Sequence, residues 1–133
     1  MKVTPINITD LKPNEIFVFG SNEGGKHFGG AARLAYSKFG AIMGQGRGLQ
    51  GQSYAVPTLT TDFEMVSLNS LKSDISTLLD FAKGNKDKHF LITAIGCGIA
   101  GFTSEEIAPL FKPFAKLKNC SLPLEFITII SKS

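Results

Sequence analysis

Short apolar runs alternate with segments of helical periodicity along this chain, and their order predicts its secondary structure. The continuous apolar run at residues 16–19 is typical of a buried strand. Residues 2–8 predict a strand at the edge of a sheet, because Pro5 has no N–H group to donate to a central ladder. Residues 31–39 predict a short helix that is closed by a glycine.

The middle of the chain contains a glycine-rich stretch followed by a long amphipathic helix. Residues 40–52 carry five glycines and predict either a loop or a strand interrupted by glycine. Residues 53–56 predict a strand that Pro57 ends. From Ser67 onward the helical spacing of apolar residues predicts a helix, which Ser67 or Asn69 could cap and Gly84 closes. These residues are Leu71, Ile75, Leu78, Leu79 and Ala82.

The C-terminal third repeats the order of strand, glycine loop and helix. Residues 90–95 predict a second buried strand, and residues 103–106 have the spacing of a capping box that begins a helix. Pro109 and Pro113 interrupt the hydrogen-bond ladder of that helix, so we expect a kink or an early end. The β-branched run at residues 125–130 predicts a last strand. Strands that alternate with helices indicate an α/β domain with a largely parallel sheet and helices on both faces.

The length and composition fit a single domain over residues 1–133. Of the 133 residues, 43% are hydrophobic and 19% charged, which is ordinary for one globular core. No apolar run approaches the roughly 20 residues that span a membrane. The start, Met-Lys-Val-Thr-Pro, lacks the apolar stretch of a signal peptide. We therefore expect a cytoplasmic protein with no membrane partner.

The residues that commonly bind metals are few, and the basic residues are scattered. Two cysteines and two histidines do not have the spacing of a zinc site or a disulfide framework, so we expect no metal and no cofactor. The net charge of +3 is mildly basic, with loose groups of lysines at residues 83–88 and 112–118. Scattered lysines usually form solvated faces, so they slightly favour an anionic ligand and do not predict a nucleic-acid partner.

Two glycine-rich segments carry the functional signal. Gly20 to Ala32 and Gly96 to Phe102 each follow a predicted strand and precede a predicted helix. In open parallel sheets, ligands bind beyond the carboxyl ends of the strands, and a helix start offers free N–H groups to an anion. Glycine also lets the backbone approach a phosphate closely. The two segments together predict one pocket for a phosphate-bearing ligand.

These segments resemble the ligand loops of macrodomains, a family that binds ADP-ribose. Phe17-Val18-Phe19-Gly20-Ser21-Asn22, followed by Lys26-His27-Phe28-Gly29-Gly30-Ala31-Ala32, is similar to the first loop of that family, and Gly98-Ile99-Ala100-Gly101 is similar to the second. The resemblance extends over residues 16–117. It implies a three-layer α/β/α fold with a mostly parallel, mixed central sheet, in a divergent, compact branch of the kind met in bacteria and phages.

The sequence departs from the family pattern at several positions. Phe28 stands where the first glycine of a triplet is usual, and Phe19 where an asparagine is usual. Ala100 replaces an aromatic residue whose place Phe102 could take. The acidic residue that holds adenine has its nearest candidate in Asp10.

The resemblance implies roles for particular residues. Asn22 would bind the distal ribose, and His27 would orient or polarise a water molecule as a general acid or base. The backbone of the two glycine loops would cradle a diphosphate. The expected ligand-binding residues are Gly20, Ser21, Gly29, Gly30, Ala31, Gly96, Cys97, Gly98, Ile99, Ala100, Gly101 and Phe102.

The function implied is binding of ADP-ribose, a related nucleotide or an ADP-ribosylated target. Hydrolysis could follow, as in an ADP-ribose-1″-phosphate phosphatase or an ADP-ribosyl hydrolase. The alternative is a non-catalytic sensor or sponge for another nucleotide or a cyclic nucleotide, and a third hypothesis is RNA binding. Cys97 has no identifiable base and is expected to be a small buried residue. Arg47, Gln50 and Gln52 are open between contacting the ligand and occupying a surface loop.

Overall fold

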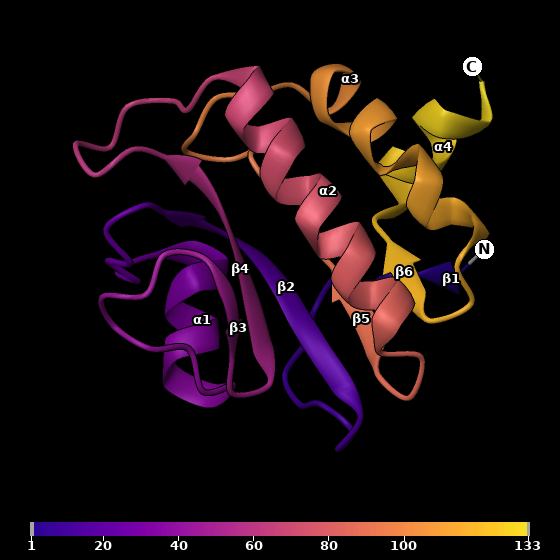
Figure 1. Cartoon of the computed structure of the whole chain (residues 1–133), viewed down its shortest axis with the longest axis horizontal. Coiled ribbons are helices and arrows are strands. Elements are labelled where there is room, and N and C mark those ends of the chain that lie inside the picture. Colours follow the sequence, from indigo (N-terminus) through magenta and orange to yellow (C-terminus); the bar gives the residue numbers. More distant parts are fainter. Residues whose placement is uncertain (1, 133) are drawn as a thin grey trace.

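The computed structural model describes residues 2–132, which form a mixed α/β domain around one six-stranded sheet (Figure 1). The elements in chain order are β1 (Lys2–Val3), β2 (Glu15–Asn22), α1 (Gly30–Lys38), β3 (Gly48–Gln50), β4 (Ser53–Leu59), α2 (Leu68–Gly84), β5 (His89–Ile92), α3 (Ser104–Ile107), the 3₁₀ helix η1 (Ala108–Lys116), β6 (Cys120–Leu122) and α4 (Leu124–Ser131). The strand order is β1-β6-β5-β2-β4-β3. All neighbouring pairs are parallel except β3 with β4, so the predicted α/β class with a mostly parallel sheet is confirmed.

Successive residues of the central strand β2 face two different apolar clusters. Ile16 and Val18 join the larger cluster, together with α2, α3, η1 and α4. Phe17 and Phe19 join the smaller cluster, which contains residues of α1. Because side chains alternate across a strand, α1 covers one face of the sheet and the other helices cover the opposite face. This explains why the run at residues 16–19 is apolar without interruption.

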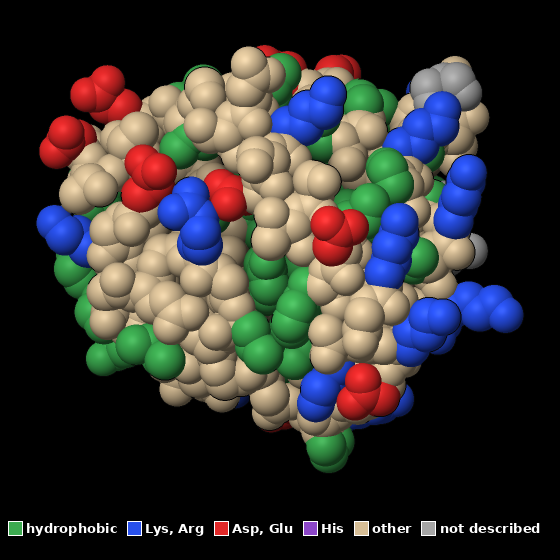
Figure 2. Space-filling model, viewed as in Figure 1, with side chains coloured by type: hydrophobic (Ala, Val, Ile, Leu, Met, Phe, Trp, Pro, Cys, Tyr) green, Lys and Arg blue, Asp and Glu red, His purple; other side chains and the backbone are tan. Residues whose placement is uncertain are grey.

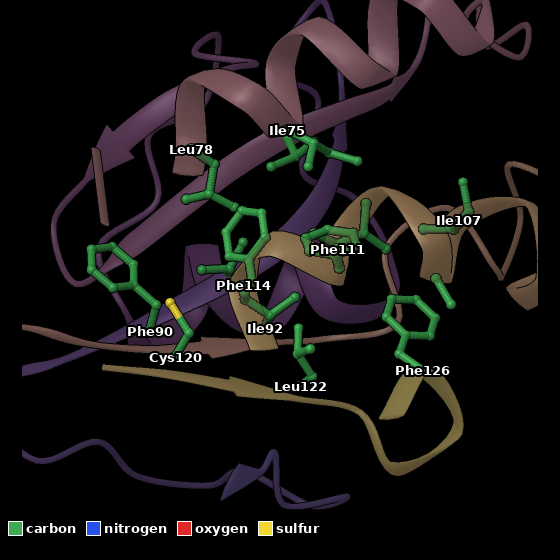
Figure 3. Packing of buried hydrophobic residues seen from close by; sticks show 14 of the residues in the cluster. Ile75, Leu78, Phe90, Ile92, Ile107, Phe111, Phe114, Cys120, Leu122 and Phe126 are labelled. Atoms are coloured by element: carbon green, nitrogen blue, oxygen red, sulfur yellow. The ribbon is translucent and has the colours of Figure 1, made fainter. Parts of the chain in front are cut away.

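The larger core lies between β5, β6 and the helices that cover them. Figure 3 shows side chains from α2, β5, β6, η1 and α4 converging there. The helix α2 begins where the sequence predicts, because the Ser67 side chain accepts a hydrogen bond from the backbone N–H of Ser70. Thr103 and Glu106 form the predicted capping box at the start of α3. The α-helix ends at Ile107 and continues as η1, so the early end expected from the two prolines is confirmed.

The predicted last strand at residues 125–130 is wrong. That segment is the helix α4, which Pro123 precedes, and the strand of this region is β6. Phe126 and Ile130, which are one helical turn apart, face the core. A short β-branched apolar run does not by itself distinguish a buried helix from a strand, and here the tertiary packing decides.

The expected end of a strand at Pro57 is also wrong. The strand β4 continues to Leu59, with Pro57 opposite Ser21 of β2. On its other side β3 pairs only as far as Ala55, so β4 has one neighbour at Pro57. Proline is tolerated at such an edge position, because no ladder hydrogen bond is lost there.

Smaller differences concern where strands begin and end. The first strand keeps only Lys2–Val3 of the expected residues 2–8 and pairs with β6. The strand expected at residues 90–95 is His89–Ile92, after which the chain turns. Within residues 40–52 a short antiparallel strand, β3, follows a loop. None of the helices formed by residues 2–132 has the length and apolar character needed to cross a membrane.

Candidate functional site

A cleft of about 630 Å³ lies at the carboxyl ends of the adjacent parallel strands β4, β2 and β5. It brings together both glycine-rich segments, since Gly20 and Gly96 are close enough that a Cβ on Gly20 would be 3.6 Å from the Gly96 nitrogen. The lining residues are Gly20, Ser21, Asn22, Lys26, Phe28, Gly29, Gly30, Ala31, Ala32, Thr58, Leu59, Phe63, Thr93, Ala94, Ile95, Gly96, Gly98, Ile99 and Ala100.

Backbone N–H groups without partners occur on both sides of the cleft. At the start of α1, the N–H groups of residues 30–32 donate to no described residue, and Gly29 supplies no side-chain cap. In the loop after β5, the N–H groups of residues 98–100 also donate to no residue within 2–132. A helix start and a loop of free amides both stabilise an anion, because the N–H dipoles point toward it.

Glycine at the rim of this cleft is not required by packing of the protein. A Cβ on Gly29, Gly30 or Gly98 would meet no atom within 4 Å. Gly30 has a φ of +58°, which favours glycine for conformational reasons. Gly29 is extended, with a φ of −150°, and Gly98 is outside the left-handed region, so both would accept a side chain. Such a side chain would project into open space beside the free amides.

Asn22 lies in the lining of the cleft and also closes the first loop. Its Nδ2 donates to the carbonyl oxygen of Lys26 at 2.8 Å, and its Oδ1 accepts from the Lys26 N–H at 2.8 Å. An asparagine amide has a second N–H and a second lone pair for a ligand. Asn22 therefore fixes the shape of the loop with part of its hydrogen-bonding capacity.

His27 belongs to the first loop but does not line the cleft. Its side chain is buried, with 1% of its surface exposed. Its Nε2 lies 2.9 Å from the Ile42 carbonyl oxygen, 3.1 Å from that of Gln45 and 3.2 Å from Gln50 Oε1. Because all three neighbours are acceptors, Nε2 carries the proton. The ring packs edge-on against Phe19, with centroids 5.4 Å apart. The structure therefore separates His27 from the place where a ligand would lie.

The segment at residues 40–51 supports the first loop from below. Gly46 packs so closely that a Cβ there would be 2.3 Å from the Asn22 carbonyl oxygen. Gly25, with a φ of +67°, packs equally closely against the backbone at Gln45. Ser21 Oγ donates to the Gly46 carbonyl oxygen. This contact between two backbones explains why glycine stands at positions 25 and 46.

The sequence leaves open whether Arg47, Gln50 and Gln52 contact the ligand, and none of them is among the described lining residues of the cleft. Gln50 is buried and donates from Nε2 to the carbonyl oxygens of residues 45 and 48. Gln52 donates to the carbonyl oxygens of Lys12, before β2, and of Glu15, the first residue of β2. Arg47 forms two hydrogen bonds with Asp74 of α2, at 2.9 and 3.0 Å, and this contact raises the pKa of the guanidinium. All three side chains connect parts of the fold.

The cleft combines one positive charge with exposed apolar side chains. Lys26 is the one charged residue among the described lining residues. Phe28, Phe63 and Ile99 line the same cleft and stay exposed, Ile99 to 91%. Phe63 has a φ of +63°, a left-handed conformation that is strained for a bulky residue. The Lys26 ammonium lies 5.5 Å from the centre of the Phe63 ring.

Three of the expected ligand-binding residues lie outside the lining. Phe102 is buried and packs against Gly96. Gly101 follows the lining residues 98–100 in the chain but is not itself in the lining. Cys97 packs against the larger core and accepts a hydrogen bond from Ser104, at 3.7 Å. Burial raises the pKa of the Cys97 thiol, which disfavours the thiolate.

Some lining residues carry no signal in the sequence. Thr58, Leu59, Thr93, Ala94 and Ile95 belong to the cleft because β4 and β5 end beside β2. Strand adjacency, which short motifs do not encode, could have identified them. Asp10, the candidate for binding adenine, is exposed and is not in the lining. Within residues 2–132 no group of three His, Cys, Asp or Glu side chains is arranged to hold a metal ion.

Comparison with known protein families, with curated proteins and with solved structures gave no match for this chain.

Proposed function

We propose that the cleft binds ADP-ribose or a closely related phosphorylated nucleotide. The observation that carries this proposal is that the free N–H groups of residues 30–32 and of residues 98–100 border one cleft. Two sets of donors suit a diphosphate better than a single phosphate, because each phosphate can be held by a separate set.

The charge of the lining supports an anionic ligand. The described lining contains a lysine and no carboxylate. The start of α1 adds the partial positive charge of a helix N-terminus. A dianionic diphosphate would therefore meet positive charge on the side of residues 26–32 and free amides on the side of residues 98–100.

The apolar rim supports a ligand that also carries a nucleoside. Phe28 and Phe63 expose rings at the cleft, and a base or sugar could cover them. Burying apolar surface stabilises a complex by about 25 cal/mol per Å² before ordering costs.

The helices on both faces of the mostly parallel sheet further support the proposed macrodomain-like arrangement.

The lining favours binding over hydrolysis. The described lining includes no histidine, aspartate, glutamate or cysteine that could act as a general base. The hydrolytic role expected for His27 is not part of the proposal, because its ring is buried away from the cleft. Asn22 keeps its proposed role of binding the distal ribose. The proposal is therefore binding of ADP-ribose without hydrolysis, and the alternative is a sensor or sponge for another nucleotide or a cyclic nucleotide.

Calorimetry with ADP-ribose tests the binding site. Gly29→Val and Gly98→Val would place side chains beside the free amides, so affinity should fall about tenfold or more, which corresponds to at least about 1.4 kcal/mol. Gly84→Val is the matched control, since a Cβ at Gly84 also meets nothing within 4 Å and Gly84 is not in the lining. Thermal unfolding of each variant would verify that it is folded. Equal affinities for all these proteins, or no binding by the wild type at millimolar ligand, would contradict the proposal.

A panel of ligands separates ADP-ribose from other nucleotides. A ligand that binds only the native state raises the unfolding temperature. ADP-ribose should give a larger shift than ADP, AMP or cyclic nucleotides. A larger shift with a cyclic nucleotide would mean that the base and phosphate are held in another way and that the ligand assignment is wrong.

A further inference from the structure

A second depression, which we call the basic groove, lies at the other end of the sheet. It has a volume of about 560 Å³ and is placed where β2 and β5 begin, beside the ends of α2 and η1. The lining residues are Asn14, Lys83, Lys86, Asp87, Lys88, His89, Lys116, Leu117, Lys118 and Asn119. Figure 2 shows Lys and Arg side chains gathered on the right side of the molecule, where α2 and η1 end.

The net charge of the basic groove is more positive than the net charge of the whole protein. Five lysines and one aspartate give it a formal charge of +4, whereas the complete chain has +3. The rest of the chain therefore sums to −1. The mild basic excess of the sequence is in fact a local concentration of charge on one surface.

The lysines of the basic groove form no ion pair within 4.0 Å with the acidic side chains of residues 2–132. Among residues 2–132, the ion pairs within 4.0 Å join Arg47 to Glu23 and to Asp74. Neighbouring ammonium groups repel one another, and an anion in the groove would relieve that repulsion. The groove is thus arranged for a ligand with several negative charges.

Stabilisation of helix ends accounts for only part of this cluster. Lys83 and Lys116 lie in the last turns of α2 and η1, where a cation interacts favourably with the helix dipole. Lys86, Lys88 and Lys118 lie outside these helices. They come from two separate connections, before β5 and before β6, and meet across the groove.

We propose that the basic groove binds a nucleic-acid strand through its phosphodiester backbone. Lysines are point charges without a fixed planar geometry, which suits contacts to successive phosphates. The described lining contains no Phe, Tyr or Trp side chain on which a base could stack, and its one imidazole, that of His89, is hydrogen-bonded through Nε2 to Ser121 Oγ at 2.7 Å. Binding should therefore depend mainly on the phosphates and little on the base sequence. This revises the expectation that nucleic acid is not a partner.

The basic groove and the cleft are independent sites. Asn14 and His89 of the groove lie at the amino ends of the strands whose carboxyl ends form the cleft. The proposal for nucleic acid does not depend on the proposed nucleotide ligand, and each can fail alone.

Fluorescence anisotropy with a labelled 20-nucleotide single-stranded RNA of mixed sequence tests the proposal. The triple variant Lys86→Ala, Lys88→Ala, Lys118→Ala should bind at least about tenfold more weakly at low salt. The slope of log affinity against log salt concentration should become shallower by about 2, since each phosphate contact on a single strand contributes about 0.7. The matched control is Lys72→Ala, Lys112→Ala, Lys132→Ala, which removes the same charge outside the groove. The control should retain most of the wild-type affinity.

Three results would overturn the proposal. The first is no binding of RNA by the wild type at low salt. The second is an equal loss of affinity in the two triple variants, which would show that only the net charge matters. The third is competition by ADP-ribose at concentrations that saturate the cleft, which would place the RNA there. If the first result were accompanied by binding to phosphatidylserine vesicles that depends on the groove lysines, a lipid surface would replace nucleic acid as the partner.

Discussion

Gln50 Oε1 lies 3.2 Å from His27 Nε2 and accepts a hydrogen bond from the Ile42 N–H at 2.7 Å. Both residues are buried: 2% of the surface of Gln50 and 1% of that of His27 is exposed. The pair joins the first glycine loop to the segment beneath it. Within residues 2–132, His27 Nδ1 has no hydrogen-bond partner, so the interactions of the ring with polar groups run through Nε2.

Gln50→Ala should lower the free energy of unfolding by about 1–3 kcal/mol, because it removes the buried side chain that accepts from the Ile42 N–H and donates to the carbonyl oxygens of residues 45 and 48. Urea denaturation would measure this. The control is Gln45→Ala, whose side-chain bonds are at the surface and whose loss should cost less. An equal effect of the two substitutions would contradict the bracing role of Gln50.

His27→Gln should be less destabilising than His27→Ala, because a glutamine can still donate toward the same three oxygens. His27→Ala also leaves a cavity beside Phe19, at a cost of about 2–4 kcal/mol. The comparison is made by thermal and urea unfolding. If His27→Ala were as stable as the wild type, the contacts of the buried ring would contribute nothing to stability and the structural role given to His27 would be wrong.

Gly46→Ala should destabilise the protein by at least about 1–3 kcal/mol, because the added Cβ would overlap the backbone at Asn22 and Glu23. The first loop would have to move, so affinity for ADP-ribose should fall as well. Gly29→Ala serves as a control for stability, since it meets no neighbouring atom. Unchanged unfolding of Gly46→Ala would show that the two backbones can separate without cost.

Phe63→Gly should raise the free energy of unfolding by up to about 1 kcal/mol, because it removes a left-handed conformation from a bulky residue. The same change removes a ring from the cleft, so affinity for ADP-ribose should decrease. Denaturation and calorimetry on one preparation would measure both effects. Greater stability together with unchanged affinity would mean that the ring does not contact the ligand.

The two cysteines should react slowly with thiol reagents. Burial raises the pKa of Cys97 above its ordinary value and that of Cys120 to about 12. A raised pKa means a smaller thiolate fraction at any given pH, so the rate of Cys97 modification should increase as the pH rises toward and beyond 9. Cys120 should react only when the protein unfolds. Rapid modification of Cys97 at pH 7 would mean that its thiol is accessible and largely deprotonated, in conflict with its burial.

The periodicity of the sequence predicted those elements whose local and tertiary signals agree. Ser67 caps α2, and the capping box at Thr103 begins α3, because both signals depend on hydrogen bonds within one turn. The prediction of a strand at residues 125–130 was wrong because the apolar residues there fit either a strand or a helix. Packing against η1 selects the helix.

The site was partly predictable for the same reason. The glycine segments are local and visible in the sequence, and nine of the twelve expected ligand-binding residues are in the lining, with Cys97, Gly101 and Phe102 outside it. Contacts that depend on strand order, such as those of Thr58 and Thr93, have no local signal. The orientation of His27 depends on Gln50, which is 23 residues away in the chain.

Gly29 and Gly98 have a consequence for how this protein would respond to mutation. Alanine fits both positions, and replacing glycine where alanine fits commonly adds about 0.4–1 kcal/mol by restricting the unfolded chain. A selection for folded protein alone would therefore favour other residues there, whereas a selection for ligand would restore glycine. A mutational scan scored separately for abundance and for binding should diverge most at these two positions.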